Sequence, residues 1–298
     1  MNTVFFSVIV PVFNRASEIS KTLLSILNQT YSAFELIVVD DGSTDNTAQQ
    51  VKELIKQRPD VNFRYFYREN AERGAARNFG ASKASGGFLN FFDSDDLMYP
   101  MHLEEAARLI ASETGLLWFH LNYDRMDETG RIFGKGPGRC SDPNRSLIRG
   151  NHLSCNGVFL NRTCFQSLSF REDRALAGME DWELWLRWAA KYPLGMRETR
   201  TSAIVYHKQR SVLEKDPAKL LNRVNLLIGL IEENKDLRSF MGTDLDAFRS
   251  SCYSYASLHL ALMKGQKRES ANYLIKSVLQ QPSGILSRRF LAILRHWI

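Results

Sequence analysis

Three carboxylates stand within four residues at Asp93-Ser94-Asp95-Asp96, directly after an apolar run. They repel one another, and they are costly to bury in a core without partners. A divalent cation would relieve the repulsion, and an oxygen-rich site suits Mg²⁺ or Mn²⁺, which can also bridge the oxygens of a diphosphate. The alternative is a solvated turn before the helix that starts at Pro100, and this cluster alone favours neither.

A further carboxylate stands at Asp181, where an apolar stripe predicts the start of a helix over residues 180–190. A carboxylate fixed in this way can accept a proton as a general base. An acid in the first turn is also favoured by the helix dipole alone, and that explanation suits Glu180 equally well. The residue types alone therefore leave Asp181 and Glu180 both open as a general base.

The elements that must position these groups alternate between strands and helices over the first hundred residues. Apolar runs predict strands over 5–10, 35–39 and 88–92, and alternating apolar residues predict a strand over 61–67. Apolar residues at helical spacing lie between these strands. This order is typical of an α/β fold with a mostly parallel central sheet flanked by helices. Ligands of such sheets bind at the carboxyl ends of the strands, where the polar clusters of this chain fall.

The remainder of the chain is less regular. We predict strands over 116–121 and 202–206, a hairpin turn over 127–130, and a mobile loop over the Gly-, Pro- and Arg-rich residues 134–150. After residue 216 the sequence becomes wholly helical. We therefore expect a catalytic domain over residues 1–212 and a helical extension over 213–298.

Charge and hydropathy limit the classes of partner. The net charge is +6, and residues 264–298 alone carry seven basic residues against one acidic residue, which accounts for the whole excess. A basic nucleic-acid-binding protein is therefore not expected. Neither an apolar run of spanning length nor a secretory signal is recognisable, so we expect a cytoplasmic protein.

The last fifteen residues, 284–298, form an amphipathic pattern. On a helix, basic residues fall along one side and five apolar residues along another. The apolar residues are Leu286, Phe290, Ile293, Leu294 and Trp297. Such a helix could lie peripherally on an anionic membrane, here the inner face of the plasma membrane. The commoner outcome is that the stripe packs against the rest of the protein, and both alternatives stay open.

Several motifs in order resemble those of the family 2 glycosyltransferases, which have a GT-A fold. They are Ser7–Asn14, Val38–Asp45, Gly74–Asn78, Asp93–Asp96, Glu180–Trp185 and Tyr206-His207. The resemblance covers roughly residues 5–212, about 70% of the chain. It implies a GT-A-like fold with a Rossmann-like nucleotide-binding half. It also implies metal-dependent, inverting transfer of a sugar from a nucleotide sugar, expected to be a UDP-sugar, to an acceptor hydroxyl in cell-surface polysaccharide or glycolipid synthesis.

The resemblance assigns eight residues to donor binding: Pro11, Phe13, Asn14, Asp41, Arg77, Asp93, Ser94 and Asp95. The first three would hold the base and the ribose, and Asp41 would accept the N–H of a uracil ring. Arg77 would reach the base or the diphosphate, unless it forms only a salt bridge on a helix surface. Asp93 would contact the ribose. Asp40 either contacts the ligand or only supports the turn.

The resemblance assigns the Mn²⁺ or Mg²⁺ ion to Asp95, with Asp96 second and His207 approaching from the last strand. It assigns the general base to Asp181. His207 could instead be a surface group without such a role. Family members commonly carry an Arg two residues before this His, where the present chain has Val205; Arg210 could replace it.

The expected partners are a nucleotide-sugar donor and a saccharide or lipid-linked acceptor, and no nucleic acid. Two rival functions are a nucleotidyltransferase of sugar-nucleotide synthesis and a non-catalytic nucleotide-sugar-binding module. The first would need a Gly-rich phosphate-binding loop after the first strand, and residues 11–16 contain no glycine. The second would be expected to have lost the carboxylates that this chain retains.

Overall fold

The computed structural model describes residues 3–207 and 216–297, which form two compact units. Unit 1 comprises residues 1–143, 152–174 and 192–208, and unit 2 comprises 144–151, 175–191 and 209–298. Two segments from the middle of the chain therefore belong with the C-terminal helices. The domain boundary predicted at 212/213 lies outside the described residues and stays a prediction.

Unit 1 is built on one sheet, and its described residues supply strands in the order β3-β2-β1-β4-β8-β6-β9-β5, with β7 paired to β6. The bounds are β1 Phe6–Val12, β2 Phe34–Asp40, β3 Asn62–Tyr67, β4 Phe88–Phe91, β5 Leu97–Met98, β6 Trp118–Asp127, β7 Ile132–Lys135, β8 Val158–Asn161 and β9 Gly195–Tyr206.

The predicted parallel sheet is confirmed for its first half, where β3, β2, β1 and β4 are all parallel. Beyond β4 the sheet is mixed, because β8 runs antiparallel to both β4 and β6. β9 is parallel to β6 and begins seven residues before the predicted strand at 202. Its first six residues are partly or fully exposed and include Arg197, Glu198 and Arg200, so this half lacks the apolar pattern of a buried strand.

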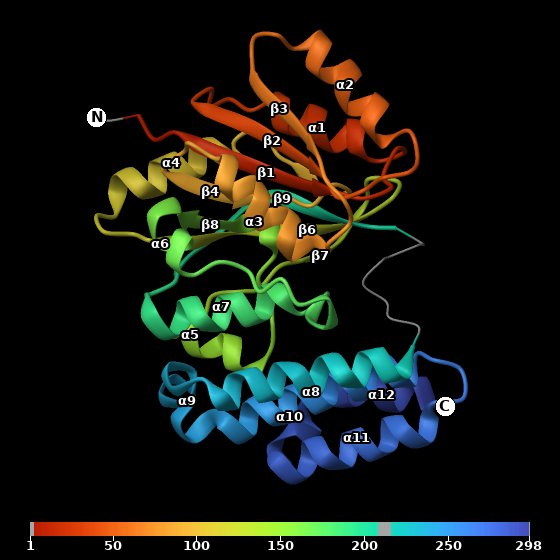
Figure 1. Cartoon of the computed structure of the whole chain (residues 1–298). Coiled ribbons are helices and arrows are strands. Elements are labelled where there is room, and N and C mark those ends of the chain that lie inside the picture. Colours follow the sequence, from red (N-terminus) through yellow and green to blue (C-terminus); the bar gives the residue numbers. More distant parts are fainter. Residues whose placement is uncertain (1–2, 208–215, 298) are drawn as a thin grey trace. The chain divides into compact units, whose positions relative to one another are not determined.

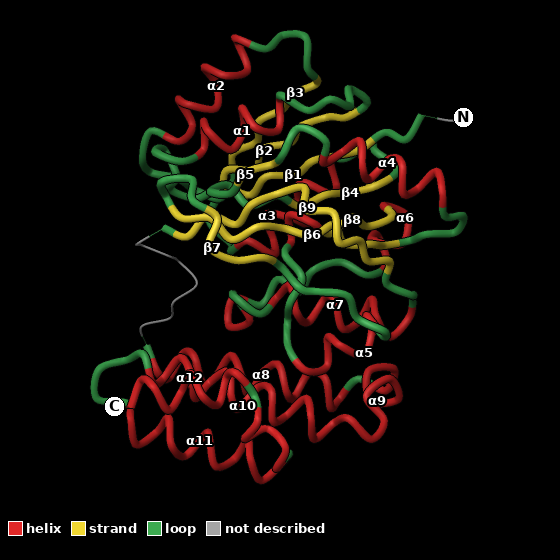
Figure 2. Tube along the Cα trace, turned by 180° about the vertical axis from the view of Figure 1, so that it is seen from behind, coloured by secondary structure: helices red, strands yellow, loops and turns green. Residues whose placement is uncertain are grey.

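Helices cover both faces of this sheet (Figures 1 and 2). They are α1 Ile19–Leu27, α2 Thr47–Gln57, α3 Arg73–Lys83, α4 His102–Ser112 and α6 Arg162–Ser167. Alternate residues of a strand point to opposite faces: Val8 and Val10 join the core formed with α1, α2 and α4. Ile9 faces α3, where a Cβ on Gly80 would lie only 2.4 Å from its side chain. Gly80 therefore lets α3 approach the sheet closely.

Unit 2 is helical. It contains the end of α5 (Pro143–Ser146), α7 Glu180–Lys191, α8 Pro217–Glu233, α9 Lys235–Met241, α10 Leu245–Ala261, α11 Lys267–Gln280 and α12 Arg288–Trp297. The region predicted as a mobile loop over 134–150 thus includes α5 and a 3-10 turn, Leu147–Arg149, whose Leu147 is buried. Trp182 of α7 donates its indole N–H to the Leu147 carbonyl at 2.8 Å and packs on Phe248 of α10.

The apolar stripe of the C-terminal helix is covered within unit 2. Ile293 is fully buried with Ala261 and Leu274, and Phe290, Leu294 and Trp297 pack against this cluster. The Trp297 indole N–H donates to Ser270 Oγ at 3.1 Å. Packing is therefore the outcome for most of the stripe, and the exception is Leu286, which is 84% exposed.

Within residues 3–207 and 216–297, no helix combines the length and the apolar character that crossing a membrane requires.

Candidate active site

The carboxyl ends of β1, β2 and β4 bring the predicted donor-side residues to one edge of the sheet. Asn14 joins the loop after β1 to the loop after β2. Its N–H donates to Ser43 Oγ at 2.9 Å, and its Oδ1 accepts the N–H of Thr44 at 2.8 Å. Asn14 has φ +49°, a conformation that Asn tolerates better than most residues. Pro11 is buried, whereas Phe13 is 46% exposed and offers its ring to solvent.

Asp41 is a buried carboxylate at the end of β2. Its Oδ1 and Oδ2 accept the N–H of Ala71 at 3.1 and 3.2 Å, and Arg68 Nε lies 3.4 Å from Oδ1. Burial raises the pKa of Asp41, against the opposing effects of these donors. Glu72, which follows Ala71, has φ +75°, and such strain commonly concentrates at functional sites. A further N–H donor from a ligand would be favourable at this carboxylate.

Asp40, by contrast, accepts hydrogen bonds on both of its oxygens, from its own turn and from β3. Its Oδ1 accepts the N–H of Ser43 at 2.8 Å, and its Oδ2 accepts the hydroxyl of Tyr65 at 2.7 Å. Burial and the Asp40 carboxylate raise the pKa of Tyr65. These contacts favour the supporting role of the two left open for Asp40.

The acidic loop after β4 is fixed by hydrogen bonds to Asn156, a buried residue that the sequence analysis did not identify. Asn156 Oδ1 accepts the N–H of Asp93 at 2.8 Å, and its Nδ2 donates to Asp96 Oδ2 at 2.6 Å. A Cβ on the next residue, Gly157, would lie 2.1 Å from the Leu121 carbonyl, so this tight approach needs glycine. The adjacent pair Asn156-Gly157 before β8 is the sequence feature that could have pointed to a tight turn at this place.

Asp96 is anchored on both of its oxygens. Besides the bond from Asn156, its Oδ1 accepts the N–H of Val205 in β9 at 2.7 Å. Burial raises the pKa of Asp96 well above its usual range, and the charges of Asp95 and Asp93 raise it further. The residue predicted as a second metal ligand thus lies inside the protein and ties the loop after β4 to β9.

Asp95 is more accessible, and His207 lies beside it. Arg15 Nε donates to Asp95 Oδ2 at 3.3 Å, and His207 Nε2 lies 3.1 Å from the Asp95 carbonyl. His207 Nδ1 lies 3.8 Å from Glu128 Oε1, so this histidine belongs to the acidic edge. Arg210, suggested as an additional phosphate contact, lies outside the described residues.

Ser94 and Arg77 complete this edge. The Ser94 carbonyl accepts the hydroxyl of Thr22 at 3.0 Å, which fixes the loop to α1. Arg77 is buried rather than on a helix surface. Its Nη2 donates to Asp93 Oδ1 at 2.9 Å, and its guanidinium lies 5.1 Å from the ring centre of Phe170. Arg77 therefore orients Asp93.

Within the described ranges, no three or more His, Cys, Asp and Glu side chains are arranged as a set that could hold a metal ion. A cation at Asp95 and His207 would therefore need ligands from the substrate or from water. Mg²⁺ is commonly bound in this way, through one or two carboxylates and substrate phosphates.

Asp181 lies in unit 2, in the first turn of α7. Its Oδ2 accepts the amide of Asn151 at 2.9 Å, and its Oδ1 accepts the N–H of Trp182 at 2.7 Å. Glu180 is 4% exposed, and its Oε2 accepts the N–H of Gly178. Asp181 is half-buried and is the more accessible of the two candidates for a base.

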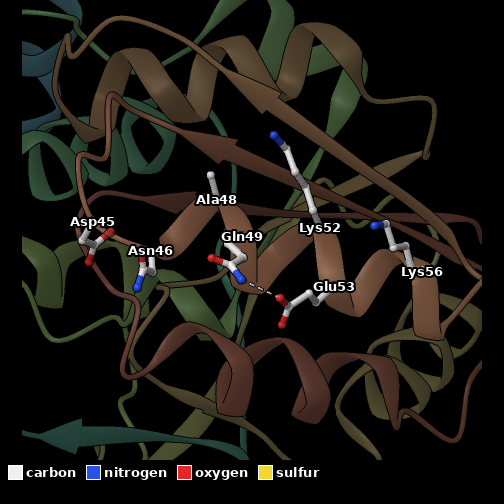
Figure 3. Close-up of a pocket in the computed structure, with 7 residues that line it drawn as sticks. All are labelled: Asp45, Asn46, Ala48, Gln49, Lys52, Glu53 and Lys56. Carbon is white, nitrogen blue, oxygen red and sulfur yellow. Dashed lines mark hydrogen bonds between the residues drawn. The ribbon is translucent and has the colours of Figure 1, made fainter.

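A surface depression on α2 is distinct from this edge (Figure 3). Its lining comes from α2 and the turn before it: Asp45, Asn46, Ala48, Gln49, Lys52, Glu53 and Lys56. Gln49 donates to Glu53 Oε1 at 2.9 Å along the helix. The depression contains none of the predicted site residues, and long side chains on one helix do not build a fixed site.

The family model described as Glycosyl transferase family 2 matches residues 7–170. Among curated relatives, the UDP-Glc:alpha-D-GlcNAc-diphosphoundecaprenol beta-1,3-glucosyltransferase WfgD of Escherichia coli is 32% identical over 187 residues, which are 62% of this chain and 70% of the relative. Three matched glycosyltransferases from Rickettsia are much longer, and the matched part is 18% to 32% of their length.

Two solved structures share the fold. S. aureus TarS 1–349 in complex with UDP-GlcNAc has a TM-score of 0.71 and 22% identity, covering 97% of this chain and 83% of that one. A mannosyltransferase from Pyrobaculum calidifontis in complex with GDP-Man and Mn²⁺ has a TM-score of 0.61 and 18% identity, covering 95% and 88%. Both are GT-A glycosyltransferases, and this chain has the same fold.

Asn156 gives the first testable prediction. Asn156→Ala removes two hydrogen bonds from the buried acidic loop, and each unsatisfied buried group costs about 1–3 kcal/mol. We therefore expect the free energy of unfolding, measured by chemical denaturation, to fall by at least that amount. The matched control is Asn62→Ala on β3, an exposed position where a change within about 0.5 kcal/mol is expected. Equal effects of the two substitutions would contradict the role given to Asn156.

Proposed function

The chain belongs to glycosyl transferase family 2, and we propose that it moves a sugar from a UDP-sugar to an acceptor hydroxyl with inversion at the anomeric carbon. The observation that carries this proposal is the convergence of Asp41, Asp93 and Asp95 at one carboxyl edge of the sheet. These three carboxylates would serve the base, the ribose and the cation at the diphosphate, which are the three parts of a bound nucleoside diphosphate.

The choice of uridine rests on Asp41. A buried carboxylate with a raised pKa gains from another N–H donor, and the ring N–H of uracil is such a donor. Phe13 is exposed at the same edge and can cover the flat face of the base. The printed names of two similar proteins, WfgD and TarS, include UDP-Glc and UDP-GlcNAc, which supports the same donor class.

The acidic edge fits a divalent cation. Asp95 and His207 would hold Mn²⁺ or Mg²⁺ with the donor's diphosphate, whereas Asp96, occupied on both oxygens, would position the loop. The cation would stabilise the charge that develops on the departing diphosphate. Arg77 would keep Asp93 oriented toward the ribose. The complex of the Pyrobaculum enzyme with Mn²⁺ supports metal use in this fold.

We propose Asp181 as the general base. As the acceptor oxygen attacks the anomeric carbon, its proton passes to the Asp181 carboxylate. The bond between the sugar and the diphosphate breaks, and UDP leaves with the bonding electron pair. Asn151 fixes the carboxylate through its bond to Oδ2. A single displacement of this kind inverts the configuration and needs no covalent enzyme intermediate.

The proposed acceptor is a lipid-linked saccharide of glycolipid or polysaccharide synthesis, as the printed name of WfgD supports. We also propose peripheral contact with an anionic membrane, through the exposed face of the tail and not through its buried stripe. Leu286 and Leu291 are 84% and 54% exposed, and Arg288 and Arg295 are exposed beside them. Exposed apolar residues with basic neighbours suit a membrane surface.

Metal dependence is the first prediction of this proposal. Transfer from a panel of UDP-, GDP- and dTDP-sugars should be detectable with UDP-sugars in the presence of Mn²⁺ or Mg²⁺, abolished by EDTA and restored by added metal. Asp95→Ala should abolish turnover and weaken UDP binding only when metal is present. Undiminished transfer in excess chelator would refute the metal site.

Asp181→Asn should retain donor binding and lose turnover, because the amide keeps the shape but cannot take the proton. A general base contributes about 10²–10⁴-fold to the rate, so kcat should fall by that factor while the Kd for UDP stays unchanged. The matched control is Glu180→Gln, which should lose far less turnover. A variant at position 181 with more than about a tenth of wild-type kcat would move the role elsewhere.

Membrane contact predicts co-sedimentation of the full-length protein with vesicles that contain phosphatidylglycerol. The double variant Leu286→Ser, Leu291→Ser should bind several-fold less, and raised salt should weaken binding by the wild type. Leu262→Ser, at an exposed position after α10, serves as the control. If wild type and double variant sediment equally, the exposed face of the tail does not mediate membrane contact.

A further inference from the structure

Arg289 of α12 is a half-buried arginine without an acidic partner. Its Nη1 donates to the Ser251 carbonyl at 3.1 Å and to Ser254 Oγ at 3.0 Å, both on α10. No carboxylate in the described part of the chain forms an ion pair with it. Burial lowers the pKa of Arg289, which means that its surroundings oppose the positive charge. A cation held in such surroundings is stabilised when an anion binds.

A second arginine contributes to the same region of unit 2. Arg223 of α8 lies against Gly178, where a Cβ would come within 3.2 Å of Nη1, and Gly178 has φ +94°. Burial lowers the pKa of His259 to about 4, and the charges of Arg289 and Arg223 lower it further. Both guanidinium groups therefore act on one imidazole, whose ring centre lies 4.2 Å from that of Tyr255. We call Arg223 and Arg289 the cationic cluster; His259, with its lowered pKa, is an uncharged neighbour at neutral pH.

The cationic cluster is connected to the proposed base through one short segment. A Cβ on Gly150 would lie 3.4 Å from Arg289 Nη2. The next residue, Asn151, donates to Asp181 Oδ2 at 2.9 Å. Burial raises the pKa of Tyr255, and the charges of Arg223 and Arg289 oppose that shift while those of Asp181 and Glu180 add to it.

We propose that Arg289 and Arg223 bind a phosphate or diphosphate group of the acceptor and so deliver its hydroxyl to Asp181. This inference rests on the proposed function. Arginine is suited to the role, because its planar fork of donors matches two phosphate oxygens and keeps its charge at every physiological pH. Arg289 uses Nη1 for its bonds to α10, and its Nη2 faces Gly150, next to the residue that donates to Asp181. His259 and Tyr255 would line the same site.

The test uses the full chain with saturating UDP and Mn²⁺, so that the donor's diphosphate site is filled. Inorganic pyrophosphate is then titrated by calorimetry. Wild type should bind it, and Arg289→Gln should weaken binding about tenfold to a hundredfold, the range for a hydrogen bond to a charged group. Arg268→Gln, at an exposed position on α11, is the matched control and should bind as wild type does.

Two further variants separate charge from folding. Arg289→Lys keeps the charge and the aliphatic stem, and it should bind more tightly than Arg289→Gln. Arg223→Gln changes the other side of the cluster and should also weaken pyrophosphate binding. Equal affinity of wild type, Arg289→Gln and Arg223→Gln, or no binding by wild type, would overturn the inference. Failure of UDP itself to bind would instead contradict the proposed function.

A turnover assay links the anion to the acceptor. An acceptor sugar on a prenyl diphosphate is compared with the same sugar as an alkyl glycoside. Arg289→Gln should raise KM about tenfold or more for the first acceptor and leave KM for the second unchanged. An equal loss on both acceptors would show that Arg289 acts on structure rather than on a phosphate, and would overturn the inference.

Discussion

The buried carboxylate of Asp96 is the constraint on which the donor-side edge depends. A carboxylate inside a protein is stable only if its oxygens receive hydrogen bonds. Asp96 receives them from the backbone of Val205 and the side chain of Asn156. These donors belong to β9 and to the turn before β8, so satisfying one charge ties three separate parts of unit 1 together.

The same constraint explains the electrostatics of the loop. Asp96 is held by neutral N–H donors, which do not cancel its charge, whereas Asp93 and Asp95 each contact an arginine. Burial and the two neighbouring carboxylates then raise the pKa of Asp96. The divalent cation proposed for this loop would relieve the repulsion.

The parts of the fold that were predictable are those where burial leaves a local pattern. β1, β2 and β4 are buried on both faces, and they appear in the sequence as mostly apolar runs. The charged first half of β9 leaves no such pattern. An amphipathic tail shows that one face is covered, but not that α10 and α11 cover it.

Asn156 was not predictable for a related reason. Its partners are distant along the chain: Asp93 lies 63 residues before it and Asp96 lies 60 residues before it. An amide that supports a site through tertiary contacts looks like any turn residue in the sequence. The carboxylates were found because like charges in a row are unusual in themselves, whatever surrounds them.

The proposed donor-binding residues lie in unit 1, whereas the proposed base and the cationic cluster lie in unit 2. The family model matches residues 7–170, which include the edge built from Asp41, Asp93 and Asp95, and it ends before Asp181 and helices α8–α12. Glycosyltransferases that use the same donor would need a common donor-binding edge. Enzymes that use different acceptors would each need a different acceptor-binding surface. If the cationic cluster binds an acceptor phosphate, acceptor choice is decided in unit 2, by side chains on helices that differ from those that hold the nucleotide. Substitution of Arg223 and Arg289 should then change the preference for the acceptor without changing the preference for the donor.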